Sequence, residues 1–407
     1  MSPNATTTIE TDLAPSARRG LLAFLLLWLC GASLRLTVLA VPPVVPLLHA
    51  DLHLSETDIG WLSSLPPMLF AVAAVPGAIL IARFGIVPAL VVGLLLNALG
   101  SAARAALPDA AALYASSIVM AAGVSIMQPA LPPLVRAWFP RRIGFATAVY
   151  TNGLLIGETL AVALTIPLVL PLVDNSWRLN FLVWSVPVLL TALLVVVCVP
   201  RLGGVNNVTP ATGRRWWPDF RRPLIWRIGL ILGSVNSMYF VTNAFLPDYV
   251  TAAGRSDLIG PSLTALNLCQ LPASFLMLGV AERLVKEPLA YATTGALALV
   301  SVVGMMVMTG VWIVVWAGVL GFVTAVTLIL ALSLPSVLSA PDDVHRTSAG
   351  MFTISYSVAM VLSVLGGWLW DVTRSPIAAL APVAVCGLLI VVLAPAVLRA
   401  ERPAITT

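Results

Sequence analysis

Charged residues are scarce in this sequence. Asp, Glu, Lys and Arg make up 10% of its 407 residues, whereas a soluble domain carries about 25%. Hydrophobic residues make up 59%, and the mean hydropathy is +1.00. This composition excludes a soluble globular protein. It predicts an all-α membrane protein, because the apolar runs are long enough to cross a bilayer as helices.

Residues that support enzyme chemistry are also few. Glu158 is the only acid deep in an apolar run, and there is no glycine-rich phosphate loop. The cysteines and histidines lie in apolar runs or at their ends, without metal-ligand spacing. They are Cys30, Cys198, Cys269, Cys386, His49, His53 and His345. We therefore expect no enzyme activity, no metal, no cofactor and no nucleic-acid partner.

Twelve apolar runs are present. Their ranges are 20–48, 57–82, 85–106, 109–138, 143–171, 177–199, 225–248, 257–280, 287–309, 311–338, 347–370 and 376–398. A polar segment rich in Arg, Gly, Pro and Asn separates the sixth run from the seventh. The sequence thus predicts a disordered tail (1–19), a six-helix bundle (20–199), a linker (200–224), a second six-helix bundle (225–398) and a short tail (399–407).

Basic residues are unequally divided between the two sides of the membrane. If both termini are cytoplasmic, 17 of the 22 Lys and Arg lie on that side and four lie outside, at Arg104, Arg178, Arg255 and Arg374. The remaining one is Arg35. Cytoplasmic loops carry the excess of basic residues, so the pattern predicts a multi-pass protein of the inner membrane with both termini in the cytoplasm. The linker arginines are expected to contact anionic lipid headgroups.

The two halves of the chain echo each other at an offset near 200 residues. Asp58-Ile-Gly60 corresponds to Asp257-Leu-Ile-Gly260, and Arg35 falls opposite Val235 or Asn236. Parallel repeats of six helices are the architecture of major facilitator transporters.

Several motifs carry a resemblance to this superfamily over nearly the whole chain. Its usual signature between the second and third helices appears as "GAILIARFG", in which both glycines and Arg83 are present but Ile81 stands at the Asp position. Within the superfamily, the chain resembles the cyanate/2-nitroimidazole porter family. The similar stretches are "LRLTVLAVPPVVPLL", "LSETDIGWLSSLPPMLFAVAAVPG", "GFATAVYTNGLLIGETLA" and "SAGMFTISYSVAMVLSVLGGWLWD". The resemblance implies a secondary transporter that works by alternating access, with Arg83 as a candidate gating residue.

Arg35 is the most unusual residue in the sequence. It is the sixteenth residue of its predicted helix, roughly 24 Å along the axis, where an arginine costs about 2.5 to 3.5 kcal/mol. Its planar fork of donors suits a small anion or carboxylate. Two hypotheses remain open: Arg35 contacts the substrate, or it forms a structural ion pair with Glu158. Glu158 in turn is a candidate proton carrier or an interhelical contact.

Uncharged polar and aromatic side chains complete the predicted substrate site. Each could instead join two helices by a hydrogen bond, which is the commoner role of such residues in spans. The candidates are Gln128, Asn236, Tyr239, Asn243, Asn267, Gln270, Trp61 and Tyr356. Gln128 and Asn236 are favoured because helices one, four, seven and ten usually line the cavity in the superfamily that the chain resembles.

The resulting prediction is a monomeric secondary transporter of a small anionic or polar solute, such as a cyanate-like anion or a nitroaromatic compound. Protons are a candidate coupling ion. The alternative is a proton-coupled multidrug exporter of the same fold, against which Arg35 argues because it would repel cationic drugs.

Overall fold

The structure, a computed structural model, describes residues 10–54, 56–106, 109–202 and 216–400. Its helices follow one another along the chain without a strand in the described residues. In the first half they are α1 (Glu10–Ser33), η1 (Pro42–Val44), α2 (Val45–Leu52), α3 (Glu56–Val72), α4 (Ala74–Phe84), α5 (Ile86–Ala106), α6 (Ala110–Trp138), α7 (Ile143–Leu164), η2 (Thr165–Val169), α8 (Leu170–Leu172) and α9 (Trp177–Leu202). In the second half they are α10 (Pro223–Ala252), η3 (Ser256–Leu258), α11 (Ile259–Leu268), α12 (Gln270–Leu284), α13 (Pro288–Val307), α14 (Val311–Leu338), α15 (Val344–Thr373), η4 (Pro376–Leu380) and α16 (Ala381–Ala400).

The twelve predicted spans are confirmed as helical segments, although several are interrupted. Ten helical segments in the described residues are long and apolar enough to cross a membrane, and α3 with α4 forms an eleventh that is bent by 48°. The first span consists of α1, a non-helical segment and α2. Because α1 begins at Glu10, part of the predicted N-terminal tail is helical. The rest of both predicted tails and most of the linker lie outside the described residues.

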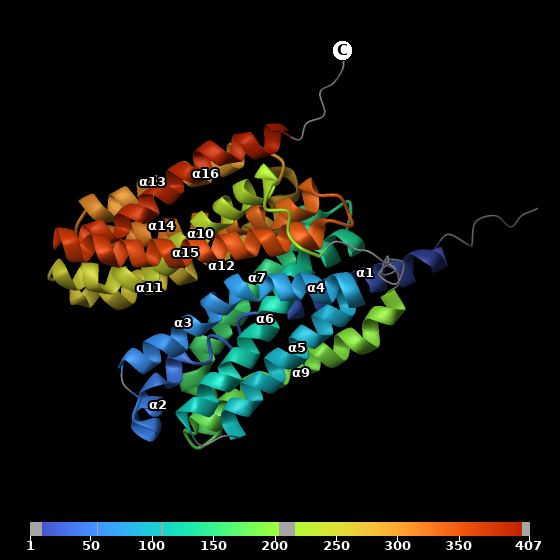
Figure 1. The fold of residues 1–407 in the computed structure, drawn as a ribbon, viewed down its shortest axis with the longest axis horizontal. Helices are drawn as coiled ribbons and strands as arrows, with labels where there is room; N and C mark the ends of the chain where they lie inside the picture. The colour runs from blue at the N-terminus through green and yellow to red at the C-terminus, as the bar shows by residue number, and fades with distance from the viewer. Residues whose placement is uncertain (1–9, 55, 107–108, 203–215, 401–407) are drawn as a thin grey trace, which may run out of the picture.

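The two six-helix halves lie side by side, with the first half below and the second above in Figure 1. They touch at the end of the molecule where α6, α7, α12 and α14 meet, and α15 of the second half also packs against α3, α4 and α6 of the first. There the Arg136 side chain donates to the backbone carbonyls of Ser336 and Ser339, and the Ser336 hydroxyl donates to the Pro132 carbonyl at 2.7 Å. We call this the closed end. The halves diverge toward α2 and α11, which is the open end (Figure 1).

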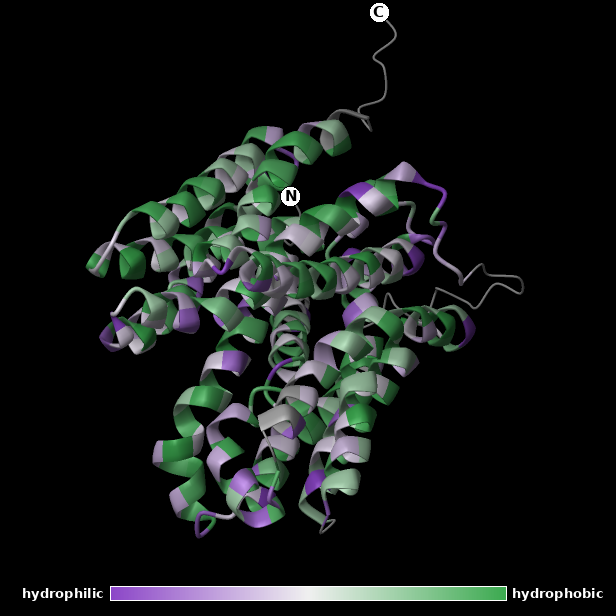
Figure 2. Ribbon diagram, turned by 60° about the vertical axis from the view of Figure 1, so that its left-hand side comes forward, coloured by the Kyte–Doolittle hydropathy of each residue, from purple (hydrophilic) through white to green (hydrophobic). Residues whose placement is uncertain are grey.

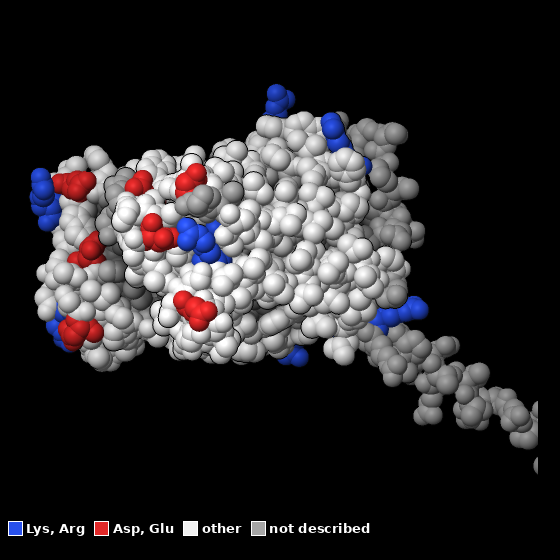
Figure 3. Space-filling view, turned by 90° about the horizontal axis from the view of Figure 1, so that it is seen from below, with Lys and Arg blue, Asp and Glu red and all other residues white. Residues whose placement is uncertain are grey.

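The outer surface is apolar, as a lipid-facing surface must be. Hydrophobic residues dominate the helices in Figure 2, and Figure 3 shows a broad area without Lys, Arg, Asp or Glu to the right of the charged groups at the left of the view. On α9, for example, Leu190, Leu193 and Val196 are each 51–53% exposed. Their spacing places them on one face of the helix, which therefore faces lipid.

The helix of the first span stops at Ser33, and residues 34–41 form turns instead. The prolines account for the last part of the break, because Pro42 and Pro43 cannot donate backbone hydrogen bonds to the carbonyls of Val38 and Leu39 and their rings clash with that turn. Arg35 was expected inside a helix, and that expectation is wrong. It lies in this break, called here the unwound segment (residues 34–41).

Side chains from neighbouring helices bind the carbonyls that the unwound segment and the end of α1 leave free. Asn97 of α5 donates to the Ser33 carbonyl at 2.7 Å, Arg104 of α5 to the Thr37 carbonyl at 3.0 Å, and Asn180 of α9 to the Ala40 carbonyl at 3.3 Å. A backbone carbonyl without a hydrogen-bond partner costs several kcal/mol in hydrocarbon. These three donors therefore make a non-helical segment possible at membrane depth.

Two further breaks occupy matching places in the halves. α3 ends before Ala73, three residues ahead of Pro76, and α11 ends before Cys269, three residues ahead of Pro272. Each proline lacks the donor that would continue the helix. In contrast, α6 runs through three prolines without interruption.

Candidate substrate site

Arg35 extends from the unwound segment toward Glu158 of α7. Its Nε lies 3.9 Å from Glu158 Oε2, and both side chains are 13% exposed. Its guanidinium also lies 5.8 Å from the centre of the Phe70 ring on α3, within range of a cation–π interaction. The predicted ion pair is thus present, but at the outer limit of ion-pair distance.

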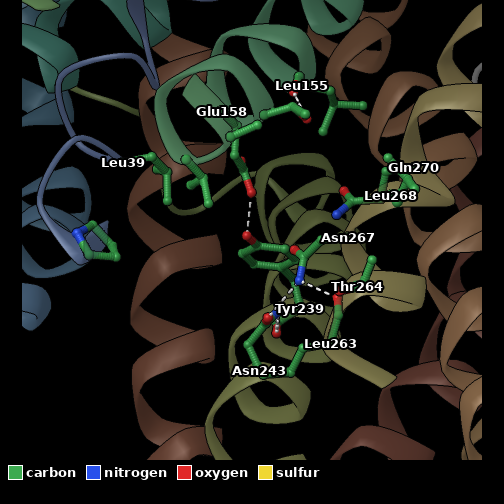
Figure 4. A pocket seen from close by; sticks show the side chains of 14 residues that line it. Leu39, Leu155, Glu158, Tyr239, Asn243, Leu263, Thr264, Asn267, Leu268 and Gln270 are labelled. Atoms are coloured by element: carbon green, nitrogen blue, oxygen red, sulfur yellow. Dashed lines mark hydrogen bonds between the residues drawn. The ribbon is translucent and has the colours of Figure 1, made fainter. Parts of the chain in front are cut away.

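Glu158 connects the two halves of the molecule. The Tyr239 hydroxyl on α10 donates to Glu158 Oε1, as the dashed line in Figure 4 shows. Arg35, Glu158 and Tyr239 therefore form a chain of polar contacts that starts in the first half and ends in the second. We call this chain the central triad. Motion of one half relative to the other must strain or break its last contact.

A cavity of about 470 Å³ lies on the open side of the central triad. Glu158 and Tyr239 form part of its wall (Figure 4), and three predicted site residues line the rest. Asn267 Nδ2 donates to Asn243 Oδ1 at 3.0 Å, and Asn243 Nδ2 donates to the Tyr239 carbonyl at 2.8 Å. With Gln270, these amides give the cavity a polar wall on the second half.

A smaller cavity, of about 30 Å³, lies beside the Arg35 side chain and is lined by Gln128, Asn236 and Tyr356. Asn236 Nδ2 donates to Ser355 Oγ at 2.8 Å, so this amide joins α10 to α15. The buried Gln128 Oε1 has no hydrogen-bond partner. An unpartnered buried acceptor is costly, which makes Gln128 the more available of the two amides for a solute.

Two predicted residues lie outside these cavities. Trp61 is 61% exposed on α3 and lines neither of the two cavities. Arg83 is exposed near the C-terminal end of α4, so it does not reach the central triad. Their predicted roles in binding and gating have no support from this geometry.

Sequence reasoning missed one charged residue at the site. Arg104 was counted among the basic residues on the outer side, at the end of the predicted span 85–106, and its burial was not foreseen: it is 1% exposed within α5. Its guanidinium lies 4.4 Å from the centre of the Phe181 ring. The clue was its position at the end of a predicted span that is rich in Ala and Gly, where a neighbouring helix can approach closely and cover a long side chain.

Comparison with known protein families decides the class of this chain. The model described as Major Facilitator Superfamily matches residues 27–364. The chain belongs to the major facilitator superfamily. It is therefore a transporter and not an enzyme, and the predicted fold and function class are confirmed at that level.

The curated relatives of this transporter include two with a named solute. The 2-nitroimidazole transporter of Escherichia coli (strain K12) is 26% identical over 371 residues, which cover 88% of this chain and 89% of the relative. The cyanate transport protein CynX of the same strain is 26% identical over 353 residues, covering 86% and 89%. An uncharacterized transporter of Bacillus subtilis (strain 168), YycB, is 24% identical and covers 84% and 85%. The resemblance to cyanate and 2-nitroimidazole porters is thus confirmed.

Solved structures support the fold of this transporter. The major facilitator transporter FucP in its outward conformation aligns with a TM-score of 0.73 at 14% identity, over 92% of this chain and 98% of that one. The human organic anion transporter MFSD10 aligns with a TM-score of 0.72 at 15% identity, over 93% and 99%. At such identities the likeness concerns the fold alone.

Proposed function

We propose that this protein is a secondary active transporter of a small anion or electron-rich polar solute, and that Arg35 binds the solute directly. The observation that carries the proposal is the position of Arg35. It lies in an unwound segment, beside cavities, and its ion pair with Glu158 is no shorter than 3.9 Å. Discontinuous spanning helices at mid-membrane are where secondary transporters bind their cargo.

Charge balance supports an anionic or electron-rich solute. Glu158 is the only acid at the central triad, and the contacts from the second half come from neutral side chains. Arg35 and Glu158 together are neutral. An anion that binds to Arg35 must displace Glu158 or find it protonated, since two negative charges would otherwise share one guanidinium.

This balance suggests how a proton gradient would be coupled to the solute. One proton on Glu158 neutralises the carboxylate and leaves one positive charge on Arg35, which one monovalent anion then neutralises. Counted over Arg35 and Glu158 alone, the loaded form and the empty form are both neutral. One proton and one anion therefore enter together without changing the net charge that the site carries across the low-dielectric barrier. We propose this proton–anion symport as the coupling scheme, in a monomer with both termini in the cytoplasm.

The named relatives favour the same solute chemistry. Cyanate is a small anion and 2-nitroimidazole carries a nitro group with two electron-rich oxygens, so both offer acceptors to a planar guanidinium. A preference for cationic drugs, the alternative function, would place like charges at Arg35.

The test is transport by Arg35 variants in proteoliposomes. With cyanate and 2-nitroimidazole as test solutes, we expect Arg35→Lys to lose at least tenfold in uptake, because lysine keeps the charge but not the fork. We expect Arg35→Ala to show no uptake above empty liposomes. Arg178→Lys, at a partly exposed arginine of the same half that pairs with Asp51, serves as the matched control and should transport as the wild type does.

Wild-type affinity in a folded Arg35→Ala protein would refute direct recognition by Arg35. Uptake of a cationic dye, with neither test solute transported, would support the drug-export alternative instead.

A further inference from the structure

Arg104 has a role that the central triad does not explain. Its Nη2 donates to the Thr37 carbonyl at 3.0 Å and to Ser101 Oγ at 3.1 Å. Its Nε and Nη1 are buried and have no hydrogen-bond partner, and it forms no ion pair with an acid of the described chain. A buried cation with two unused donors is costly, so holding the unwound segment accounts for only part of this side chain.

Arg104 also lines a third cavity. This cavity has a volume of about 140 Å³ and is lined by both arginines, Arg35 and Arg104, together with Glu158, Tyr239 and Ser117. The Ser117 hydroxyl on α6 is also buried without a hydrogen-bond partner. Three donor atoms of two residues that line one cavity therefore lack an acceptor.

Charge and size indicate what would supply that acceptor. The cavity lining carries two guanidinium groups and one carboxylate, so its net charge is one positive. A water molecule takes roughly 30 Å³ of liquid, so the cavity has room for a few waters or one small solute. A monovalent anion of two to four heavy atoms would neutralise it.

We propose that Arg104 and Ser117 form a second anion-binding subsite next to Arg35, which holds the negative end of a small solute on the side of the first half. The proposal rests on the proposed function and adds to it the residues that clamp the solute opposite Arg35. The Phe181 ring stacked on the guanidinium and the Thr37 carbonyl fix the orientation of Arg104. The subsite is therefore formed before the solute arrives.

The test measures equilibrium binding of radiolabelled thiocyanate, a stable linear monovalent anion, to the full chain in nanodiscs, with gluconate balancing the ionic strength. We expect Ser117→Ala to bind about tenfold more weakly, since it removes one hydrogen bond to an anion. We expect Arg104→Gln to show no saturable binding. We expect Arg35→Gln to weaken binding but to leave it saturable.

Asn180→Ala is the structural control, because it removes another donor to the unwound segment without lining the cavity. It should lower the melting temperature and leave the thiocyanate affinity unchanged. If it weakens binding as much as Arg104→Gln does, Arg104 is a support for the unwound segment and the subsite does not exist. Ser117→Ala, a change that only removes a hydroxyl, keeps the test valid if Arg104→Gln does not fold.

The outcomes separate the two proposals. Binding that is unaffected by Arg35→Gln and lost in both subsite variants refutes recognition by Arg35 and supports the subsite. Binding that is lost in Arg35→Gln and unchanged in Ser117→Ala and Arg104→Gln refutes the subsite and leaves the proposed function in place. No saturable binding to the wild type also refutes the subsite.

Discussion

The first and second halves of this transporter share a helix order but differ in what they bring to the centre. The first half supplies Arg35, Glu158 and Arg104, and its opening span is unwound. The corresponding helix of the second half, α10, runs unbroken from Pro223 to Ala252 and contributes neutral groups such as Tyr239. Under the proposed function, this difference is a division of labour between the halves, in which the first half recognises the charge of the solute and the second half closes on it.

Helix continuity explains much of this contrast. Within α10, some polar side chains bond to carbonyls of their own helix, as Ser237 does with Gly233. Others bond to a neighbouring helix, as Asn236 does with Ser355 of α15. The unwound segment keeps a few backbone hydrogen bonds of its own, such as the one from Leu39 N–H to the Arg35 carbonyl at 2.9 Å, and α5 and α9 supply donors to the Thr37 and Ala40 carbonyls. The charged side chains at the centre of the molecule thus lie in the same half as the donors that support the unwound segment.

The largest effect should come from removing the acid that links the halves. We expect Glu158→Gln to reduce pH-gradient-driven uptake at least tenfold and to leave solute exchange intact, because glutamine keeps the bridge to Tyr239 possible but cannot carry a proton. Uptake and exchange of cyanate in proteoliposomes measure the two activities, with Glu287→Gln as an exposed control. If both activities persist at wild-type rates, Glu158 does not couple the gradient.

An intermediate effect should come from separating the halves at the closed end. A Cβ at Gly144 would come within 2.8 Å of the Ala281 backbone across the interface, so Gly144→Val should prevent the closed end from forming. On a background without native cysteines, we expect a cysteine at Ser336 to react several-fold faster with a membrane-impermeant maleimide in Gly144→Val.

Gly279→Val is the matched control, because nothing lies within 4 Å of a Cβ at that glycine. Equal labelling rates in the two variants would show that Gly144 does not hold the halves together.

The smallest effect should come from a neutral contact of the second half. We expect Asn236→Ala to weaken solute affinity about three- to tenfold, the range of one neutral hydrogen bond. Ser237→Ala removes a hydroxyl that donates to the Gly233 carbonyl within α10, and it should have no effect on affinity. Thermal-shift titration with 2-nitroimidazole would check both. A loss in Asn236→Ala as large as in Arg35→Ala would contradict the division of labour between the halves.

The sequence predicted the spans well, because hydropathy alone determines which segments enter lipid. It also offered a pair between Arg35 and Glu158 as one of two open hypotheses, since each was the only charge of its sign deep in a predicted span. It did not reveal the unwound segment: Pro42 and Pro43 predicted a bend, but the three donors that stabilise a non-helical stretch come from helices distant in the sequence. The burial of Arg104 was missed for the same reason, because it depends on the neighbouring Phe181 and not on the residues beside Arg104 in the chain.

The donors that hold the unwound segment also have a kinetic consequence. Asn97, Arg104 and Asn180 fix it from two helices of the same half, so the segment moves as part of that half and does not fold around the solute. A solute that enters from the open end meets a surface that is already ordered, and little conformational entropy is lost on binding. We therefore expect related solutes to associate at similar rates, and their affinities to differ mainly in how long each one stays bound.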